Sequence, residues 1–248
     1  MAEMIKKVVI AAAGYGTRML HLATNKPKHL INIRERPFLY YLLSNLKEAG
    51  LEEMILVVGY KKGAMEEFRR RYKKEFPLLL VDQFAIAGKE KYGTAIPLQC
   101  VKEIVGQENF LMVFGDNLYS PQDINFLRVD DNYHYISVIE NPHPEKYGAV
   151  ITNGEFLVKL VEKPKTFVSN FINTGLHKFT PEIFEAADKI TPSLNGEYVL
   201  TDAIHLLAQN RRVKVKQISD YWLDFGNPGD IFKMWKFLER NKKIFEHQ

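Results

Sequence analysis

The sequence contains one cysteine and lacks long hydrophobic runs, and both features narrow the class of protein. Because Cys100 has no second cysteine to pair with, an internal disulfide and a cysteine-based metal site are excluded. The apolar run at residues 8–13 is too short for a membrane span or for the core of a signal peptide. We therefore expect a cytoplasmic protein outside the membrane, with Cys100 as a buried structural thiol.

A strong excess of one charge is also missing. The 34 basic and 30 acidic residues leave a formal net charge of +4. The densest basic run, at residues 69–74, is interleaved with acidic residues, which is typical of a solvated helix face. No aromatic or groove-reading motif accompanies it, so we predict that the protein does not bind nucleic acid.

Apolar runs and helical spacings alternate along the first half of the chain. Strands are predicted at residues 8–13, 54–58, 78–81 and 110–114, and helices at residues 38–49, 65–72 and 94–105. This alternation is typical of a mostly parallel sheet covered by helices on both faces. With 248 residues, of which 46% are hydrophobic, we expect one continuous core.

The pattern changes after about residue 133. Strands are predicted at residues 135–140, 148–152, 156–162 and 213–218, and helices at residues 181–187, 201–209 and 231–238. Asn153 and Gly154 separate two of these strands and predict a hairpin. The second half therefore adds antiparallel pairing to the sheet.

Two familiar glycine motifs are incomplete. A dinucleotide-binding fingerprint needs a third glycine where this chain has Met19, which argues against an oxidoreductase. A Walker A loop needs Gly-Lys where this chain has Thr17 and Arg18 after Gly16. The scattered histidines form neither a Ser-His-Asp arrangement nor a metal-binding pair at helical spacing.

What remains is the stretch AAAGYGTRMLHLATNKPKHL, in which an apolar strand runs into Gly14 and Gly16 and then reaches Arg18 and Lys28. Glycines let backbone N–H groups approach a ligand closely, and the two cations add positive charge on the same connection. This combination suits phosphate. The alternative is that both cations form ordinary surface salt bridges.

Further short motifs follow in a fixed order: RPFLYYLLSNLKEAGLEEMILVVGY, GTA (93–95), GDN (115–117), YGAV (147–150), EKP (162–164), NTG (173–175) and WLDFG (222–226). Together with the glycine loop, they resemble the sugar-1-phosphate nucleotidyltransferases, or NDP-sugar pyrophosphorylases. The resemblance covers nearly the whole chain and includes the catalytic domains of glucose-1-phosphate thymidylyl- and uridylyltransferases.

The resemblance implies a single Rossmann-like, three-layer α/β/α nucleotidyltransferase domain, with a mostly parallel mixed sheet, over residues 1–248. Residues 1–130 would mainly bind the nucleotide and residues 131–248 the sugar phosphate, without a C-terminal β-helix. Possible homo-oligomerisation is left open.

The implied reaction, part of NDP-sugar biosynthesis, transfers a nucleoside monophosphate from a nucleoside triphosphate to a sugar 1-phosphate and releases pyrophosphate. We favour dTTP or UTP with glucose 1-phosphate. One alternative is a mannose- or heptose-1-phosphate guanylyltransferase. Another is a regulatory homologue that binds nucleotide or NDP-sugar without turnover.

Such a reaction needs cations more than a general base. A phosphate monoester has a second pKa of about 6, so the attacking oxygen is already ionised near neutral pH. The catalyst must instead hold two polyanions together. The resemblance assigns this catalytic role to Arg18, Lys28 and Lys163.

The resemblance also implies a Mg²⁺ site formed by Asp116 and Asp224. Mg²⁺ typically takes one or two protein carboxylates and completes its shell with water and phosphate oxygens. Asp116 follows a predicted strand, at the edge of the sheet where ligands gather in parallel α/β folds. The alternative for either aspartate is a turn or helix-cap residue.

The recognition residues are likewise implied by the resemblance. The expected nucleotide-binding residues are Ala12, Ala13, Gly14, Gly16, Thr17, Gln83, Gly88, Gly93 and Thr94, with Gln83 at the edge of the base. The expected sugar-binding residues are Gly148, Glu162, Asn173 and Gly175. The alternatives are an exposed flexible loop around Gln83 and a strand-end surface position for Glu162.

Overall fold

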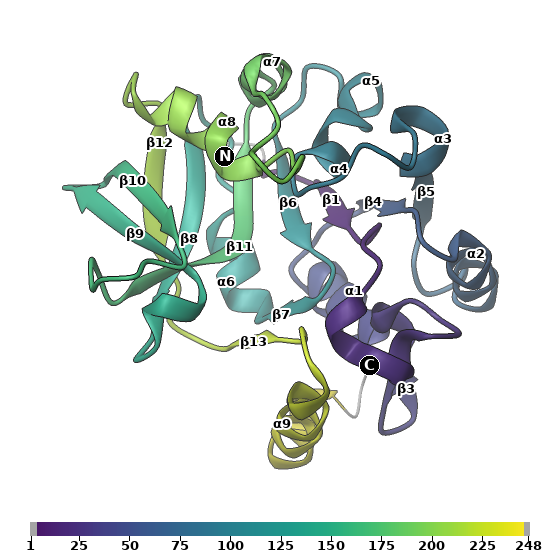
Figure 1. The fold of residues 1–248 in the computed structure, drawn as a ribbon. Helices are drawn as coiled ribbons and strands as arrows, with labels where there is room; N and C mark the ends of the chain where they lie inside the picture. Colours follow the sequence, from purple (N-terminus) through teal and green to yellow (C-terminus); the bar gives the residue numbers. More distant parts are fainter. Residues whose placement is uncertain (1–3, 246–248) are drawn as a thin grey trace.

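The computed structural model describes residues 4–245 and shows a mixed α/β fold built on a nine-stranded sheet (Figure 1). The strand order is β5-β4-β1-β6-β11-β8-β12-β10-β9. These strands are β1 (Lys7–Ala11), β4 (Glu53–Val58), β5 (Leu78–Asp82), β6 (Phe110–Phe114), β8 (His134–Glu140), β9 (Gly148–Asn153), β10 (Phe156–Glu162), β11 (Phe171–Phe179) and β12 (Val213–Gln217).

Helices and smaller ribbons surround this sheet. The α-helices are α1 (Phe38–Glu48), α2 (Lys62–Arg71), α3 (Gln83–Ala87), α4 (Ile96–Gln99), α5 (Lys102–Val105), α6 (Pro121–Phe126), α7 (Glu182–Lys189), α8 (Leu200–Ala208), α9 (Pro228–Arg240) and α10 (Lys242–Phe245). Three 3₁₀ segments are η1 (Thr17–Ala23), η2 (Lys28–Leu30) and η3 (Pro144–Lys146). Two ribbons pair β7 (Asn117–Tyr119) with β13 (Trp222–Asp224), and β2 (Asn32–Ile33) with β3 (Arg36–Pro37).

The first half of the sheet matches the prediction of parallel strands between helices. β5, β4, β1 and β6 pair in parallel, and alternate residues of β1 point into two separate buried clusters. Val8 and Ile10 pack with α1 and α2 on one face, whereas Val9 packs with α4, α7 and α8 on the other. Both faces are covered, which explains why these strands are continuously apolar.

The second half corrects the prediction of a mostly parallel sheet. Here β11 runs antiparallel to β6 and β8, and β10 runs antiparallel to β12 and β9, while only β12 and β8 are parallel. A further pairing of β9 with β11 closes these strands into a partial barrel, seen on the left of Figure 1. The tight β9–β10 hairpin forces antiparallel pairing, because parallel neighbours need a long crossover.

Strand β11 itself was not predicted from the sequence. It contains polar residues that read as a loop but are buried, among them Thr174, His177 and Lys178. The ammonium group of Lys178 donates to the backbone carbonyls of Asp131 (2.5 Å) and Tyr133 (2.6 Å). These partners lie more than 40 residues away, so sequence periodicity could not reveal them.

One other local prediction needs correction, and one helix was not predicted. The helix predicted at residues 94–105 is two short helices, α4 and α5, that break around Cys100 and Val101. Helix α3 was not predicted; it begins at Gln83, and the Asp82 carboxylate caps its first turn. Cys100 is buried as predicted, and burial raises the pKa of its thiol to about 11.

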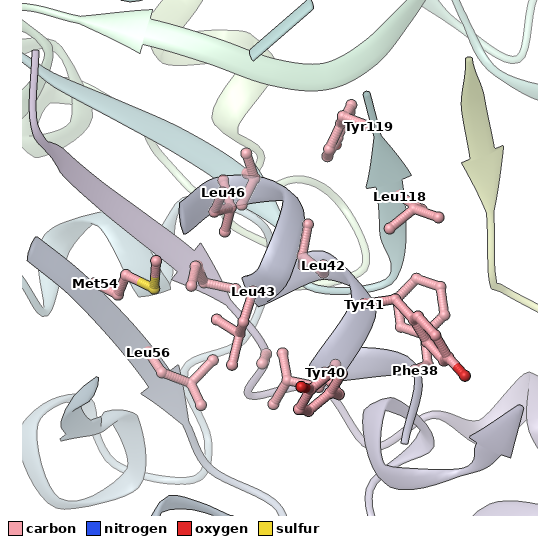
Figure 2. Close-up of a cluster of buried hydrophobic side chains, with 14 of the residues drawn as sticks. Phe38, Tyr40, Tyr41, Leu42, Leu43, Leu46, Met54, Leu56, Leu118 and Tyr119 are labelled. Atoms are coloured by element: carbon pink, nitrogen blue, oxygen red, sulfur yellow. The ribbon is translucent and has the colours of Figure 1, made fainter. Parts of the chain in front are cut away.

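Helix α1 joins the parallel sheet to the small β7–β13 ribbon. Figure 2 shows Leu43 and Leu46 near Met54 and Leu56 of β4, and Leu42 on the side of the helix toward Leu118 of β7.

None of the helices formed by residues 4–245 combines the length and apolar character that crossing a membrane requires.

We predict that Leu42→Ala lowers the free energy of unfolding by about 2–5 kcal/mol, because it leaves a cavity where a fully buried side chain packs. Urea denaturation followed by circular dichroism measures this. The matched control is Leu79→Ala on β5, a side chain that is 48% exposed, which should change stability by no more than about 0.5 kcal/mol. Equal losses in the two variants would contradict this account of the core.

Candidate active site

The parallel pairing of β1 with β6 brings two polar loops together. Ala11 lies opposite Phe114 at the carboxyl ends of these strands, and the Gly115 N–H donates to the Ala11 carbonyl at 2.9 Å. A Cβ at position 115 would lie 3.1 Å from the Cβ of Ala12 and 3.3 Å from the ring of His29. These contacts are tighter than usual for a Cβ, so any larger residue at position 115 would force the two loops slightly apart.

Lys28 and Asp116 form an ion pair across these loops. Their side chains are only 10% and 20% exposed. Burial by itself would raise the pKa of Asp116, but the neighbouring Lys28 charge, with a smaller contribution from His29, outweighs burial and lowers it. Asp116 is therefore held as a carboxylate. His29 is the converse case, since burial foremost and Lys28 next lower its pKa to about 3.

A cleft of about 420 Å³ opens at this edge of the sheet. Its wall contains many of the residues expected to bind phosphate and nucleotide: Ala13, Gly14, Gly16, Thr17, Arg18, Lys28, Gln83, Gly93, Thr94 and Asp116. Ala12 is buried behind the wall, and Gly88 lies outside the lining. The structure thus brings together residues that are far apart in sequence, from the glycine loop to Asp116.

Arg18 and Lys28 differ in their surroundings. Arg18, in η1, is exposed and makes no hydrogen bond or ion pair with any other residue between 4 and 245. The surface salt bridge considered as its alternative role is therefore not formed. Lys28 is buried against Gly16, where a Cβ would lie 3.4 Å from the Cβ of Lys28. One cation is free and the other is fixed.

Asp224 reaches the same region on the β7–β13 ribbon. It lies opposite Asn117, the residue after Asp116, and the Phe225 N–H donates to the Asp116 carbonyl at 2.8 Å. Its carboxylate lies against Gly226, a residue of the cleft wall. Burial first, and then the charge of Asp116, raise the pKa of Asp224 to about 6.

Asp116 and Asp224 are the residues here that could hold a divalent cation. Within the described part of the chain, no group of three or more potential metal ligands occurs, so a metal ion would need oxygens from its ligand or from water. The Asp224 carboxylate has neither a hydrogen bond nor an ion pair among residues 4–245. A destabilised carboxylate beside a second one fits Mg²⁺, which accepts two carboxylates plus phosphate oxygens.

Gln83 and Gly93 form another part of the cleft wall. Gln83 is 5% exposed and lines the cleft, yet its side-chain Oε1 has no hydrogen-bond partner among the described residues. The exposed-loop alternative for Gln83 is therefore wrong. Gly93 has a φ of 124°, and a Cβ there would collide with the backbone of Tyr198, so only glycine fits.

Most of the residues expected to bind sugar meet at one end of β9, β10 and β11. On β9, Gly148 pairs with Glu162 of β10, and the next residue, Ala149, pairs with Ile172 of β11. Because β11 runs antiparallel to β9, Asn173 lies at the same end as Gly148. Lys163 follows directly and donates its backbone N–H to the Tyr147 carbonyl at 2.9 Å. Gly175 is buried deeper, against Phe114 and Tyr119. These residues form a second group, outside the lining of the main cleft.

Sequence reasoning missed several residues of the cleft wall: Tyr15, His29, Phe84, Tyr92, Pro97, Phe114, Glu197 and Gly226. The rings of Tyr15 and Phe84 pack against each other at a tilt of 34°, with 5.9 Å between their centroids. Tyr15 stands inside the glycine motif and could have been noticed there. Glu197 comes from a loop more than 100 residues away that pairs with Tyr92, and nothing in its own sequence context points to the cleft.

Fold and cleft together define a class: a mixed α/β protein whose ligand cleft lies at the carboxyl ends of parallel strands and is lined by a glycine loop, cations and a carboxylate. A family model described as "Nucleotidyl transferase" matches residues 7–241. The chain therefore belongs to the nucleotidyl transferase family of enzymes.

Individual relatives agree with this assignment. The chain is 32% identical over 235 residues to "UTP--glucose-1-phosphate uridylyltransferase AglF" of Haloferax volcanii, covering 90% of this chain and 93% of that protein. It is 33% identical over 232 residues to "Bifunctional protein GlmU" of Methanocaldococcus jannaschii, covering 93% of this chain but only 53% of the relative. The chain thus spans about half the length of that second relative.

The fold is also shared with solved structures. A UDP-glucose pyrophosphorylase in complex with UDP-glucose superposes with a TM-score of 0.82, at 24% identity, covering 96% of this chain and all of that chain. At this level of identity, the likeness concerns the fold.

We predict that Asp224→Asn stabilises the metal-free protein at pH 7–8 by on the order of 1 kcal/mol, because it removes a buried carboxylate that is repelled by Asp116. Thermal unfolding in the presence of a chelator measures this change. Asp220→Asn on the neighbouring exposed loop is the control and should be neutral within about 0.5 kcal/mol. A less stable Asp224→Asn protein would show that the carboxylate has a structural role.

Proposed function

We propose that this protein is a sugar-1-phosphate nucleotidyltransferase that joins the nucleoside monophosphate of UTP or dTTP to a hexose 1-phosphate, with glucose 1-phosphate favoured. The observation that carries the proposal is the single cleft that Arg18, Lys28 and Asp116 share with the glycine loop, beside Asp224. The name of the Haloferax volcanii relative, a UTP–glucose-1-phosphate uridylyltransferase, supports UTP and glucose 1-phosphate as the first substrates to test.

In this reaction, a phosphate oxygen of the sugar 1-phosphate attacks the α-phosphorus of the nucleotide. The new P–O bond forms as the bond from the α-phosphorus to the bridging oxygen breaks, and pyrophosphate leaves with that bonding electron pair. Because the nucleophile is already an anion near neutral pH, no side chain has to remove a proton from it. This agrees with a cleft whose one histidine, His29, is buried and has a pKa of about 3.

The residues of the chain have to overcome repulsion between two anions. The N–H groups of the glycine loop would surround the triphosphate, and Arg18, which has no partner among residues 4–245, would bind its outer phosphates. Lys28 is held beside Asp116 and would face the reacting phosphates. Fixed cations of this kind stabilise developing charge without reorganising during the reaction.

Asp116 and Asp224 are the ligands that we propose for Mg²⁺. When bound, the ion would neutralise phosphate charge and polarise the phosphorus for attack. The pair suits it because Asp116 is kept ionised by Lys28, while Asp224 lies in a position where its own negative charge is unfavourable.

Recognition is divided between the two halves of the chain in this proposal. Gln83, Gly93 and Thr94 would read the nucleobase, and the unpartnered amide oxygen of Gln83 supports this because a base N–H could satisfy it. Gly148, Glu162, Asn173 and Gly175 would surround the sugar, and Lys163 would hold its phosphate. Residues 1–130 thus mainly serve the nucleotide and residues 131–248 the sugar phosphate.

The direct test is pyrophosphate release by the purified protein with Mg²⁺, across UTP, dTTP, GTP, CTP and ATP and the 1-phosphates of glucose, N-acetylglucosamine, galactose and mannose. We expect the highest kcat/KM with UTP or dTTP and glucose 1-phosphate. Preference for GTP and mannose 1-phosphate would favour a guanylyltransferase. Tight nucleotide binding by calorimetry without any turnover would instead indicate a sensor and refute the proposal.

We predict that Arg18→Ala lowers kcat/KM for the nucleotide by about 10²–10³-fold, because it removes a cation proposed to bind the phosphates. Within the described part of the chain, Arg18 has no hydrogen bond or ion pair that the substitution would break. Its melting temperature should match that of the wild type. Arg69→Ala, on the exposed face of α2, is the control for losing one positive charge and should retain full activity. Parallel losses of stability and activity in Arg18→Ala would point to a structural arginine.

A further inference from the structure

A buried histidine stands directly behind the residues proposed to bind sugar. His177 lies on β11, is 1% exposed and is absent from the wall of the main cleft. Its Nε2 is 3.1 Å from the side-chain oxygen of Asn173, whereas its Nδ1 has no hydrogen-bond partner among the described residues. A buried polar atom left without a partner is costly, so its retention calls for an explanation.

A second hydrogen bond shows which side-chain atom of Asn173 is the amide oxygen. The backbone N–H of Gly175 donates to the same oxygen at 3.1 Å. Because a backbone N–H can only donate, the atom that it contacts is the amide oxygen and not the amide nitrogen. The neighbouring His177 Nε2 must therefore also donate, which fixes His177 as the neutral Nε2–H tautomer.

The backbone around these residues is irregular. The pairing of β11 with β8 shifts register between Asn173 and His177, and Gly175 has a φ of 80° in the middle of the strand. A Cβ on Gly175 would collide with the ring of Phe114, a wall residue of the cleft. The bulge thus places Asn173 and His177 on either side of a kink that only glycine can make.

The imidazole cannot easily reorient. Phe114 meets its ring edge-on at 6.0 Å between centroids, and Phe179 lies against it at 5.3 Å. Burial lowers the pKa of His177 to about 3, in agreement with a permanently neutral ring. Both bonds to Asn173 therefore come from rigid donors: a strand amide and a clamped ring.

With its oxygen held twice, Asn173 is left with its NH₂ group, which makes no hydrogen bond to any other residue between 4 and 245. We propose that His177 is a positioning residue, which holds the amide of Asn173 so that its NH₂ group faces a hydroxyl oxygen of the sugar. This inference rests on the proposed function for the role of Asn173, and it adds the residue that orients it.

Steady-state kinetics with UTP and glucose 1-phosphate test the proposal in four variants: His177→Phe, His177→Gln, Asn173→Ala and the double variant of Asn173→Ala with His177→Phe. His177→Phe keeps an aromatic ring but cannot donate, so the KM for glucose 1-phosphate should rise about 10-fold while the KM for UTP stays within about twofold. His177→Gln carries its amide nitrogen the same number of bonds from Cβ as Nε2 and should restore most of the lost affinity. In an Asn173→Ala background, His177→Phe should have little further effect.

The outcomes separate this inference from the proposed function. If the wild type turns over and His177→Phe leaves the KM for the sugar phosphate unchanged, or raises both KM values alike, the positioning role is refuted. The same holds if His177→Gln is no better than His177→Phe at equal melting temperature. If the wild type shows no turnover with any pair of substrates, the proposed function itself fails.

A spectroscopic measurement tests the geometry without catalysis. Correlation of ring ¹⁵N and ¹H signals in the wild type at pH 7 should show His177 as the neutral Nε2–H tautomer, and Asn173→Ala should shift that signal. Adding glucose 1-phosphate alone should shift the side-chain NH₂ signals of Asn173 in the wild type and in His177→Gln but not in His177→Phe. An Nδ1–H tautomer, or identical shifts in all three proteins, would overturn the proposal.

Discussion

The ion pair between Lys28 and Asp116 joins two loops that lie 88 residues apart, and the geometry of the cleft depends on it. It exists because β1 and β6 are parallel neighbours, so that both loops leave the sheet at the same edge. Taking both charges out of water is costly, and removing either partner would leave the other buried and unpaired. The main effect of the pair is thus to hold a cation and a carboxylate side by side, and its contribution to stability is secondary.

The β7–β13 ribbon adds a second carboxylate to this pair and makes the apo site electrostatically unfavourable. Asp224 is partly buried close to Asp116, and burial together with the Asp116 charge raises the pKa of its carboxyl. By contrast, the buried ammonium group of Lys178 is ion-paired with the carboxylate of Asp131. Asp116 is paired with Lys28, whereas Asp224 has no ion pair among the described residues. This pair of carboxylates therefore carries one more negative charge than Lys28 compensates, which suits a divalent cation.

The sequence predicted the parallel half of the fold well because its strands are buried on both faces and read as continuous apolar runs. The motifs also placed Arg18, Lys28, Gln83 and Asp116 in one cleft, since each follows the carboxyl end of a parallel strand. The partial barrel and β11 could not be predicted, because pairing over long distances sets them and their polar residues find partners only in the folded chain. Glu197 could not be predicted either, because it reaches the cleft through a pairing with the distant Tyr92.

Strand β11 connects the two groups of residues that we propose for the two substrates. Its second half pairs with β6 of the parallel sheet, its first half pairs with β9 of the barrel, and both halves pair with β8. At the kink between them, the Thr174 carbonyl accepts bonds from Tyr119 on β7 (2.9 Å) and from the Trp222 indole on β13 (3.1 Å). The ribbon that carries Asp224 is therefore tied to the strand that carries Asn173. Transfer between two bound phosphates requires that the residues binding them stay at a fixed separation. A continuous sheet with one shared strand fixes this separation more directly than two lobes joined by a hinge would.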